Sequence, residues 1–74
     1  LLSFAPGVAA SDRRLKTNIE KVGEYPDGLG QYEFDYIWGG TRQRGVMADE
    51  ARVLRPEILG PQIAGYDTVD YSKL

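Results

Sequence analysis

The sequence predicts a small α+β domain with a short antiparallel sheet and one or two short helices. Three observations support this fold class. Aromatic residues occupy every second position between residues 32 and 38, with Glu33, Asp35 and Ile37 between them, as in a strand with one buried face. Residues 48–54 have the pattern of a short helix, and glycine and proline punctuate the segments between these elements. A chain of 74 residues has room for one such domain.

The first ten residues, LLSFAPGVAA, are apolar and uncharged, and the composition changes abruptly to Ser-Asp-Arg-Arg-Leu-Lys at residue 11. We interpret residues 1–10 as a linker or strand from an upstream stalk domain, and residues 11–74 as the domain itself. The chain begins with leucine, so we expect it to be a piece of a longer polypeptide.

Between residues 15 and 22 the sequence leaves helix and strand open. Leu15, Ile19 and Val22 have helical spacing, but the β-branched residues of this segment favour a strand. Residues 25–28, Tyr-Pro-Asp-Gly, predict a tight turn, because proline presets φ and aspartate and glycine suit the positions that follow.

The strand predicted over residues 32–38 is the strongest local signal. Gly39 and Gly40 end it and predict a hairpin-like return into residues 42–47. At this spacing we expect the rings in the core or in a trimer interface, with a sugar-stacking platform as the alternative. Four rings share the predicted face: Tyr32, Phe34, Tyr36 and Trp38.

The helix predicted over residues 48–54 has acidic residues, Asp49 and Glu50, in its first turn and basic residues near its end, which suits the helix dipole. Pro56 is expected to stop it. The helix position accounts for the adjacent carboxylates, for which a metal site or an acid–base pair is the alternative.

Beyond the helix, Gly60-Pro61 predicts a turn, and residues 65–71 alternate like a final strand.

Composition excludes several classes of protein. Nine basic residues against 11 acidic ones give no general attraction to nucleic acid. The chain lacks cysteine and histidine, and with them disulfides, thiolate metal sites and the commonest zinc ligand. No apolar run approaches the roughly 20 residues of a membrane span. We therefore expect no cofactor, metal or membrane contact, and we expect oligomerisation to support so small a domain.

The segment from Ser11 to Ile19 holds the candidate catalytic residues. Ser11 and Lys16 could form a Ser–Lys dyad, in which a neutral amine takes the hydroxyl proton while the oxygen attacks a carbonyl. The lysine pKa must then fall from about 10.4 toward neutrality, through burial or through positive neighbours such as Arg13 and Arg14. Spacing alone favours the alternative, a solvated Ser-Asp turn followed by a basic surface.

Four ordered blocks extend this signal. Residues 11–19 read SDRRLKTNI and residues 32–36 read YEFDY; residues 45–50 read GVMADE, followed by Pro56-Glu57, and residues 69–74 read VDYSKL. Together they resemble the intramolecular chaperone domain of endosialidase-type phage tail proteins, the S74 peptidase family. The resemblance covers nearly all of residues 11–74.

The resemblance implies a C-terminal chaperone of a phage tail fibre or tail spike, which brings three copies of the chain together and promotes folding of the upstream β-rich stalk. It implies assembly in the host cytoplasm and a final place in the virion tail. Ser11 matches the nucleophile and Lys16 its base partner, as in a single-turnover serine peptidase that releases itself by autoproteolysis. A non-cleaving structural tip or cap is the alternative, and a tip that binds a host-surface receptor or carbohydrate is another.

Two departures from the family pattern accompany the resemblance. Asp49 stands where the family usually has glutamine. Many members continue into long helices that coil as a trimer, whereas this chain stops at Leu74. We interpret residues 11–74 as the globular part of such a domain, without the long C-terminal helices.

The bond to be cut is either Ser11–Asp12 or Ala10–Ser11. The family cut is reported after the serine. Attack by the Ser11 hydroxyl on the preceding Ala10 carbonyl passes through a five-membered ring, whereas attack on its own carbonyl needs a strained four-membered one. The sequence leaves both bonds open.

Overall fold

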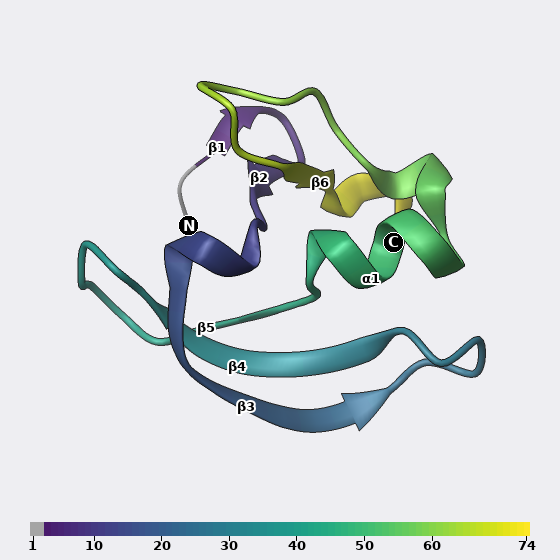
Figure 1. Cartoon of the computed structure of the whole chain (residues 1–74), viewed down its shortest axis with the longest axis horizontal. Coiled ribbons are helices and arrows are strands. Elements are labelled where there is room, and N and C mark those ends of the chain that lie inside the picture. Colours follow the sequence, from purple (N-terminus) through teal and green to yellow (C-terminus); the bar gives the residue numbers. More distant parts are fainter. Residues whose placement is uncertain (1–2) are drawn as a thin grey trace.

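Two antiparallel sheets and one α-helix make up the computed structural model, which describes residues 3–74 (Figure 1). The predicted α+β class is confirmed, with two small sheets in place of one. Three short 3₁₀ turns accompany the main elements: those at Arg13–Leu15 and Pro56–Ile58 lie between elements, and the one at Tyr71–Lys73 follows the last strand. The main elements in chain order are β1 (Ser3–Ala5), β2 (Val8–Ala10), β3 (Lys16–Glu24), β4 (Gly30–Tyr36), β5 (Gln43–Gly45), α1 (Ala48–Leu54) and β6 (Thr68–Asp70).

The larger sheet has the order β3-β4-β5. The segment that sequence left open is strand β3, so the β-branched residues prevail over the helical spacing. Its pairing with β4 is interrupted by two irregularities, and Asn18 lies at the first of them with a φ of +50°. Asparagine tolerates this left-handed conformation better than most residues, which explains its place in the strand. The predicted turn before β4 is confirmed, since the Gly28 N–H donates to the Tyr25 carbonyl at 2.9 Å.

Strand β4 buries every second side chain, as its alternation predicts. Tyr32, Phe34 and Tyr36 face the core, and the return through β5 pairs antiparallel with β4. Trp38 departs from the prediction, because the strand ends at Tyr36 and a turn follows in which the Gly39 N–H donates to the Tyr36 carbonyl at 2.9 Å. Trp38 is half exposed and stacks on the Tyr36 ring, so the predicted four-ring strand face is wrong at its last member.

The smaller sheet joins the two ends of the described chain, with the order β1-β2-β6. Pro6-Gly7 connects β1 to β2, and β2 pairs with β6 through Val8↔Asp70, Ala9↔Val69 and Ala10↔Thr68. Since Val8, Ala9 and Ala10 are buried, this part of the predicted linker or strand lies inside the fold. The first two residues of that segment lie outside the described residues.

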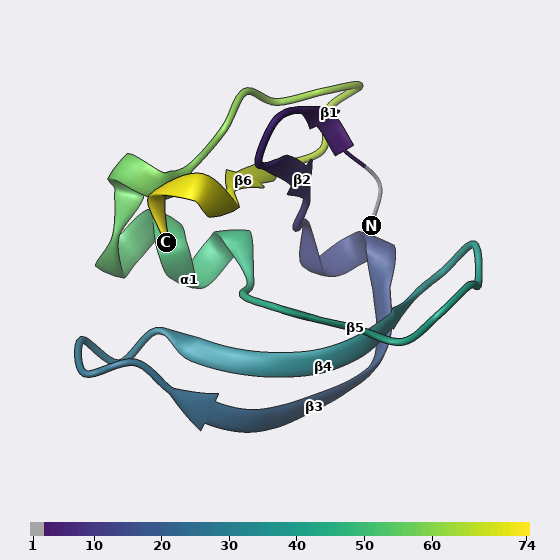
Figure 2. The same ribbon diagram turned by 180° about the vertical axis from the view of Figure 1, so that it is seen from behind.

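Helix α1 has the predicted bounds, and it ends before Pro56. Figures 1 and 2 show it on one face of the larger sheet, on the same side as the smaller sheet. One cluster of buried side chains joins the helix to β6, and a second joins β4 to β2. The first contains Leu29, Val46, Ala48, Ala51, Ile58 and Val69, and the second contains Ala10, Tyr32, Phe34, Tyr36 and Met47.

The C-terminal segment differs from the prediction in two respects. The tight turn lies at Ala64 and Gly65, between paired Ile63 and Tyr66, and not at Gly60-Pro61. Gly60 instead donates its N–H to the Thr68 carbonyl at 3.1 Å. The final strand is shorter than the predicted 65–71, because the chain enters a 3₁₀ turn at Tyr71. Within the described residues, none of the helices is long and apolar enough to cross a membrane.

Candidate active site

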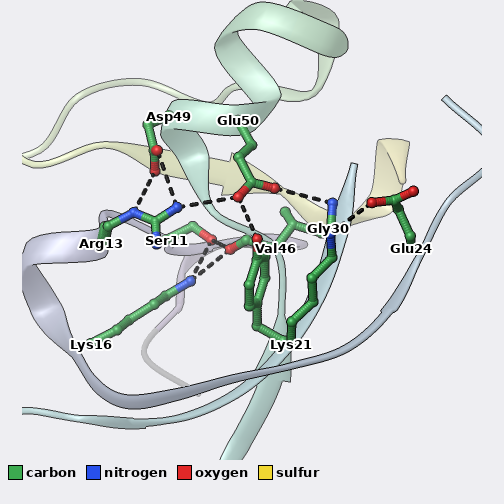
Figure 3. Close-up of polar contacts among 10 residues, drawn as sticks. Ser11, Arg13, Lys16, Lys21, Glu24, Gly30, Val46, Asp49 and Glu50 are labelled. Atoms are coloured by element: carbon green, nitrogen blue, oxygen red, sulfur yellow. Dashed lines mark hydrogen bonds and ion pairs between the residues drawn. The ribbon is translucent and has the colours of Figure 1, made fainter. Parts of the chain in front are cut away.

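Ser11 lies at the junction of the two sheets and the helix (Figure 3). It follows β2 directly and is fully buried. Its N–H donates to the Asp67 carbonyl at 3.2 Å, and its own carbonyl accepts the Ala48 N–H at the start of α1 at 3.0 Å. The backbone on both sides of the candidate nucleophile is thus held in place.

The structure brings Lys16 and Ser11 together. The 3₁₀ turn at Arg13–Leu15 reverses the chain, so that the first residue of β3 returns its side chain to Ser11. Lys16 Nζ lies 2.9 Å from Ser11 Oγ and 2.7 Å from the Val46 carbonyl oxygen. The Phe34 ring covers the amine, with 4.1 Å between Nζ and the ring centroid. The predicted solvated turn with a surface lysine is therefore wrong, because both side chains are buried.

Burial lowers the pKa of Lys16 to about 7, because the amine loses hydration that favours its charged form. The positive charge of Arg13 lowers this pKa further, while Asp49 and Asp12 oppose the shift. A large share of the molecules therefore carry a neutral amine near pH 7. This is the protonation state that a lysine needs to act as a general base.

Two residues that sequence reasoning did not assign to the site complete its hydrogen bonds. The Val46 carbonyl accepts from both Ser11 Oγ, at 2.7 Å, and Lys16 Nζ. The Tyr71 hydroxyl lies 2.8 Å from Ser11 Oγ and accepts the Val46 N–H at 3.2 Å. Both residues belong to blocks that carry the family resemblance. The glycine that precedes Val46 is the sequence signal for a close contact at this point. A Cβ on Gly45 would collide with the Tyr71 hydroxyl.

The backbone carbonyl that precedes Ser11 also has a side-chain partner. The Tyr36 hydroxyl, at the end of β4, donates to the Ala10 carbonyl oxygen at 2.6 Å. Ala10 and Tyr36 are both buried. The two peptide bonds proposed for cleavage thus meet different donors: Tyr36 for the Ala10 carbonyl and the Ala48 N–H for the Ser11 carbonyl.

Asp12 anchors the turn between the two candidate catalytic residues. Its buried carboxylate accepts the backbone N–H groups of Arg14, at 2.9 Å, and Asp67, at 3.0 Å. The Arg14 guanidinium binds the same carboxylate at 2.8 and 3.0 Å. These hydrogen bonds, above all those from the Arg14 side chain, hold the pKa of Asp12 well below its usual range. Asp12 is therefore an ionised structural group beside the dyad.

The paired carboxylates of α1 are engaged by Arg13. Its guanidinium contacts Asp49 at 3.2 and 3.3 Å and Glu50 at 3.2 Å, and Glu50 also accepts the Gly30 N–H and the Tyr32 hydroxyl (Figure 3). These contacts hold the start of α1 against the turn that precedes Lys16. In residues 3–74, no three His, Cys, Asp or Glu side chains gather where they could hold a metal ion.

No protein-family model, curated protein or solved structure matches the chain.

Proposed function

We propose that this chain is the intramolecular chaperone domain of a trimeric phage tail fibre or tail spike, and that it releases itself by cutting its own backbone beside Ser11. One observation carries the self-cleavage: a buried lysine amine with a pKa lowered to about 7 lies 2.9 Å from a buried serine hydroxyl. This is the arrangement that a Ser–Lys nucleophile and base require.

The hydrogen bonds around Ser11 are compatible with proton transfer to Lys16. The Ser11 hydroxyl donates to the Val46 carbonyl, and a rotation about its C–O bond turns the hydrogen toward Nζ. Tyr71 accepts the Val46 N–H, which leaves its own hydrogen free to point at Ser11 Oγ. In that arrangement Oγ accepts from Tyr71 while it donates to the neutral amine.

Burial of the nucleophile favours a cut within the same chain. Ser11 has no solvent-exposed surface, so a foreign peptide would first have to open the core. The carbonyls that adjoin Ser11 Oγ through the chain are those of Ala10 and Ser11 itself. A single self-cleavage needs no substrate entry, which is consistent with a domain that acts once.

The chaperone role, the trimer and the upstream stalk come from the family resemblance. Exposed large apolar side chains support self-association, because a second copy that covers them removes apolar surface from water and so stabilises a small domain. They are Ile37, Trp38, Val53, Leu54, Tyr66 and Leu74. We place the assembled protein in the virion tail, after folding in the host cytoplasm. The further partner that we propose for the tail fibre is a host-surface receptor.

A second candidate function is a structural tip or cap that does not cut. The observation in its favour is that Ser11, Lys16, Val46 and Tyr71 satisfy one another, as a buried polar cluster with a purely structural role would. Among the described residues, no buried side-chain nitrogen or oxygen lacks a hydrogen-bond partner. The carbohydrate-binding alternative needs exposed aromatic rings on which a sugar can stack, and three of the four rings are buried.

Intact-mass spectrometry of the 74-residue chain over time, at pH 8, separates the two candidates. We expect the wild type to yield two fragments whose masses add up to the chain plus one water. Ser11→Ala is expected to stay whole, because it lacks the nucleophile. Ser72→Ala, which removes an exposed serine hydroxyl, serves as the matched control and should cut like the wild type. A wild-type chain that stays whole while folded would overturn self-cleavage and favour the non-cutting cap.

A further inference from the structure

The hydroxyl of Tyr36 donates to the Ala10 carbonyl oxygen at 2.6 Å from within the core. The ring is held between two others: it meets Phe34 edge-on at 5.2 Å between centroids and stacks on Trp38 at 4.4 Å. Burial also raises the pKa of Tyr36, so its hydroxyl keeps its proton throughout the neutral range. A fixed, protonated donor therefore points at the carbonyl on the N-terminal side of Ser11.

We propose that Tyr36 supplies the oxyanion hydrogen bond for self-cleavage, and that the bond cut is Ala10–Ser11. This inference rests on the proposed function and deepens it by naming a further catalytic residue and the scissile bond. A preorganised donor at the oxygen where negative charge develops stabilises the transition state more than the ground state.

The reaction balances as an N-to-O acyl shift followed by hydrolysis. Ser11 Oγ forms a bond to the Ala10 carbonyl carbon as its proton passes to neutral Lys16 Nζ, and the carbonyl π electrons move to the oxygen held by Tyr36. The C–N bond then breaks as the lysine ammonium returns its proton to the Ser11 nitrogen. The product is an ester between Ala10 and Ser11 Oγ with a free Ser11 amine. Water then hydrolyses the ester to the Ala10 carboxylate and the Ser11 hydroxyl.

The alternative bond, Ser11–Asp12, also has a donor, since the Ala48 N–H contacts the Ser11 carbonyl at 3.0 Å. Donors alone therefore do not select the bond. Ring size does, because attack on the Ala10 carbonyl closes a ring of Oγ, Cβ, Cα, N and the Ala10 carbon. Attack on the Ser11 carbonyl closes a ring one atom smaller and strained. The Ala10 carbonyl is the one that combines a side-chain donor with an unstrained path.

The test uses the full 74-residue chain as wild type, Tyr36→Phe, Tyr32→Phe and Ser11→Ala. We expect fragments 1–10 and 11–74 from the wild type, and a cleavage rate at least about 10-fold lower in Tyr36→Phe, toward the roughly 100-fold loss of an oxyanion donor. Tyr32→Phe makes the same change on the same strand face, where the hydroxyl binds Glu50, and should cut at nearly the wild-type rate. The pH midpoint of the rate should be unchanged in Tyr36→Phe, since Lys16 sets it.

Hydroxylamine identifies the acylated carbonyl. In its presence, an ester on Ala10 releases residues 1–10 as a hydroxamate, heavier than the free acid by one NH group. Release of residues 1–11 in that form would overturn the choice of bond. A Tyr36→Phe variant with the wild-type rate would overturn the role of Tyr36. In both cases cleavage that is lost in Ser11→Ala leaves the proposed function standing, whereas a wild type that never cuts removes that function itself.

Discussion

Lys16 is the residue whose chemistry changes most on folding. In an unfolded chain its amine is hydrated and charged, with a pKa of about 10.4. The fold moves it beneath the Phe34 ring and beside Ser11, where burial lowers the pKa to about 7. Arg13 assists, but its charge is shared with Asp49 and Glu50. Removal of water is thus the main cause of the shift.

This pKa predicts the pH dependence of self-cleavage. The neutral amine is the base, so the rate should rise with pH, reach half its maximum near pH 7 and level off above pH 8. Lys16→Arg should stay whole at every pH, because its guanidinium remains protonated. Mass spectrometry of samples quenched between pH 5 and pH 9 gives the profile. A flat profile would contradict the role of Lys16.

Arg13→Gln tests the cause of the shift within the same profile. Loss of the positive charge should raise the midpoint by well under one pH unit, since burial dominates. Arg55→Gln, which breaks the pair of Arg55 with Asp27, is the matched control and should leave the midpoint in place.

Among the elements, the link from β5 to α1 determines the geometry around Ser11. Gly45 ends β5, and the next residue, Val46, presents its carbonyl to Ser11 and Lys16 and its N–H to Tyr71. The close approach of Tyr71 leaves no room for a side chain at position 45. The glycine is thus required by tertiary packing, since its own φ is not in the left-handed region.

Gly45→Ala should therefore displace Tyr71, lower the free energy of unfolding by about 1–3 kcal/mol and slow self-cleavage. Urea denaturation gives the first quantity, and fragment mass against time gives the second. Gly23→Ala is the matched control, because its Cβ would meet the movable end of the Gln31 side chain. Equal stability and equal cleavage in the two variants would show that Tyr71 is not held as described.

Element prediction succeeded where the pattern is local and failed where pairing decides. Alternation marks β4, and the charge distribution marks α1 with its correct bounds. The same alternation continues to Trp38, but pairing with β3 ends at Lys16↔Tyr36, so the strand stops there. Similarly, Gly60-Pro61 has the composition of a turn, yet the Gly60 N–H donates to the Thr68 carbonyl and the segment does not turn. Local sequence does not contain these partners.

For the whole molecule, the decisive contact joins the two ends of the described chain. Strand β2 pairs with β6, and Ala10 at the end of β2 packs against the buried side chains of β4. The proposed scissile bond is therefore buried in the folded domain, between β2 and the 3₁₀ turn at Arg13–Leu15. Cleavage would then report that the domain has folded.

The proposed trimer gives a prediction at this scale. Light scattering coupled to size exclusion should give three chain masses at tens of micromolar, because each copy exposes large apolar side chains that a partner can cover. The chain in concentrated urea supplies the one-chain reference. A single chain mass across the whole concentration range would contradict self-association of this segment.

The sequence by itself determined the α+β class, the bounds of the helix, the inward face of β4 and the pairing of Ser11 with Lys16 as a candidate dyad. The first three follow from periodicity, turn chemistry and charge placement, and the dyad from the resemblance of four sequence blocks to a known family. Only the tertiary structure decided that the lysine is buried, that Val46 and Tyr71 hold the serine, and that Tyr36 reaches the Ala10 carbonyl. The physical reason is that desolvation and hydrogen-bond partners come from strands far apart in the chain, and they exist only once those strands pair.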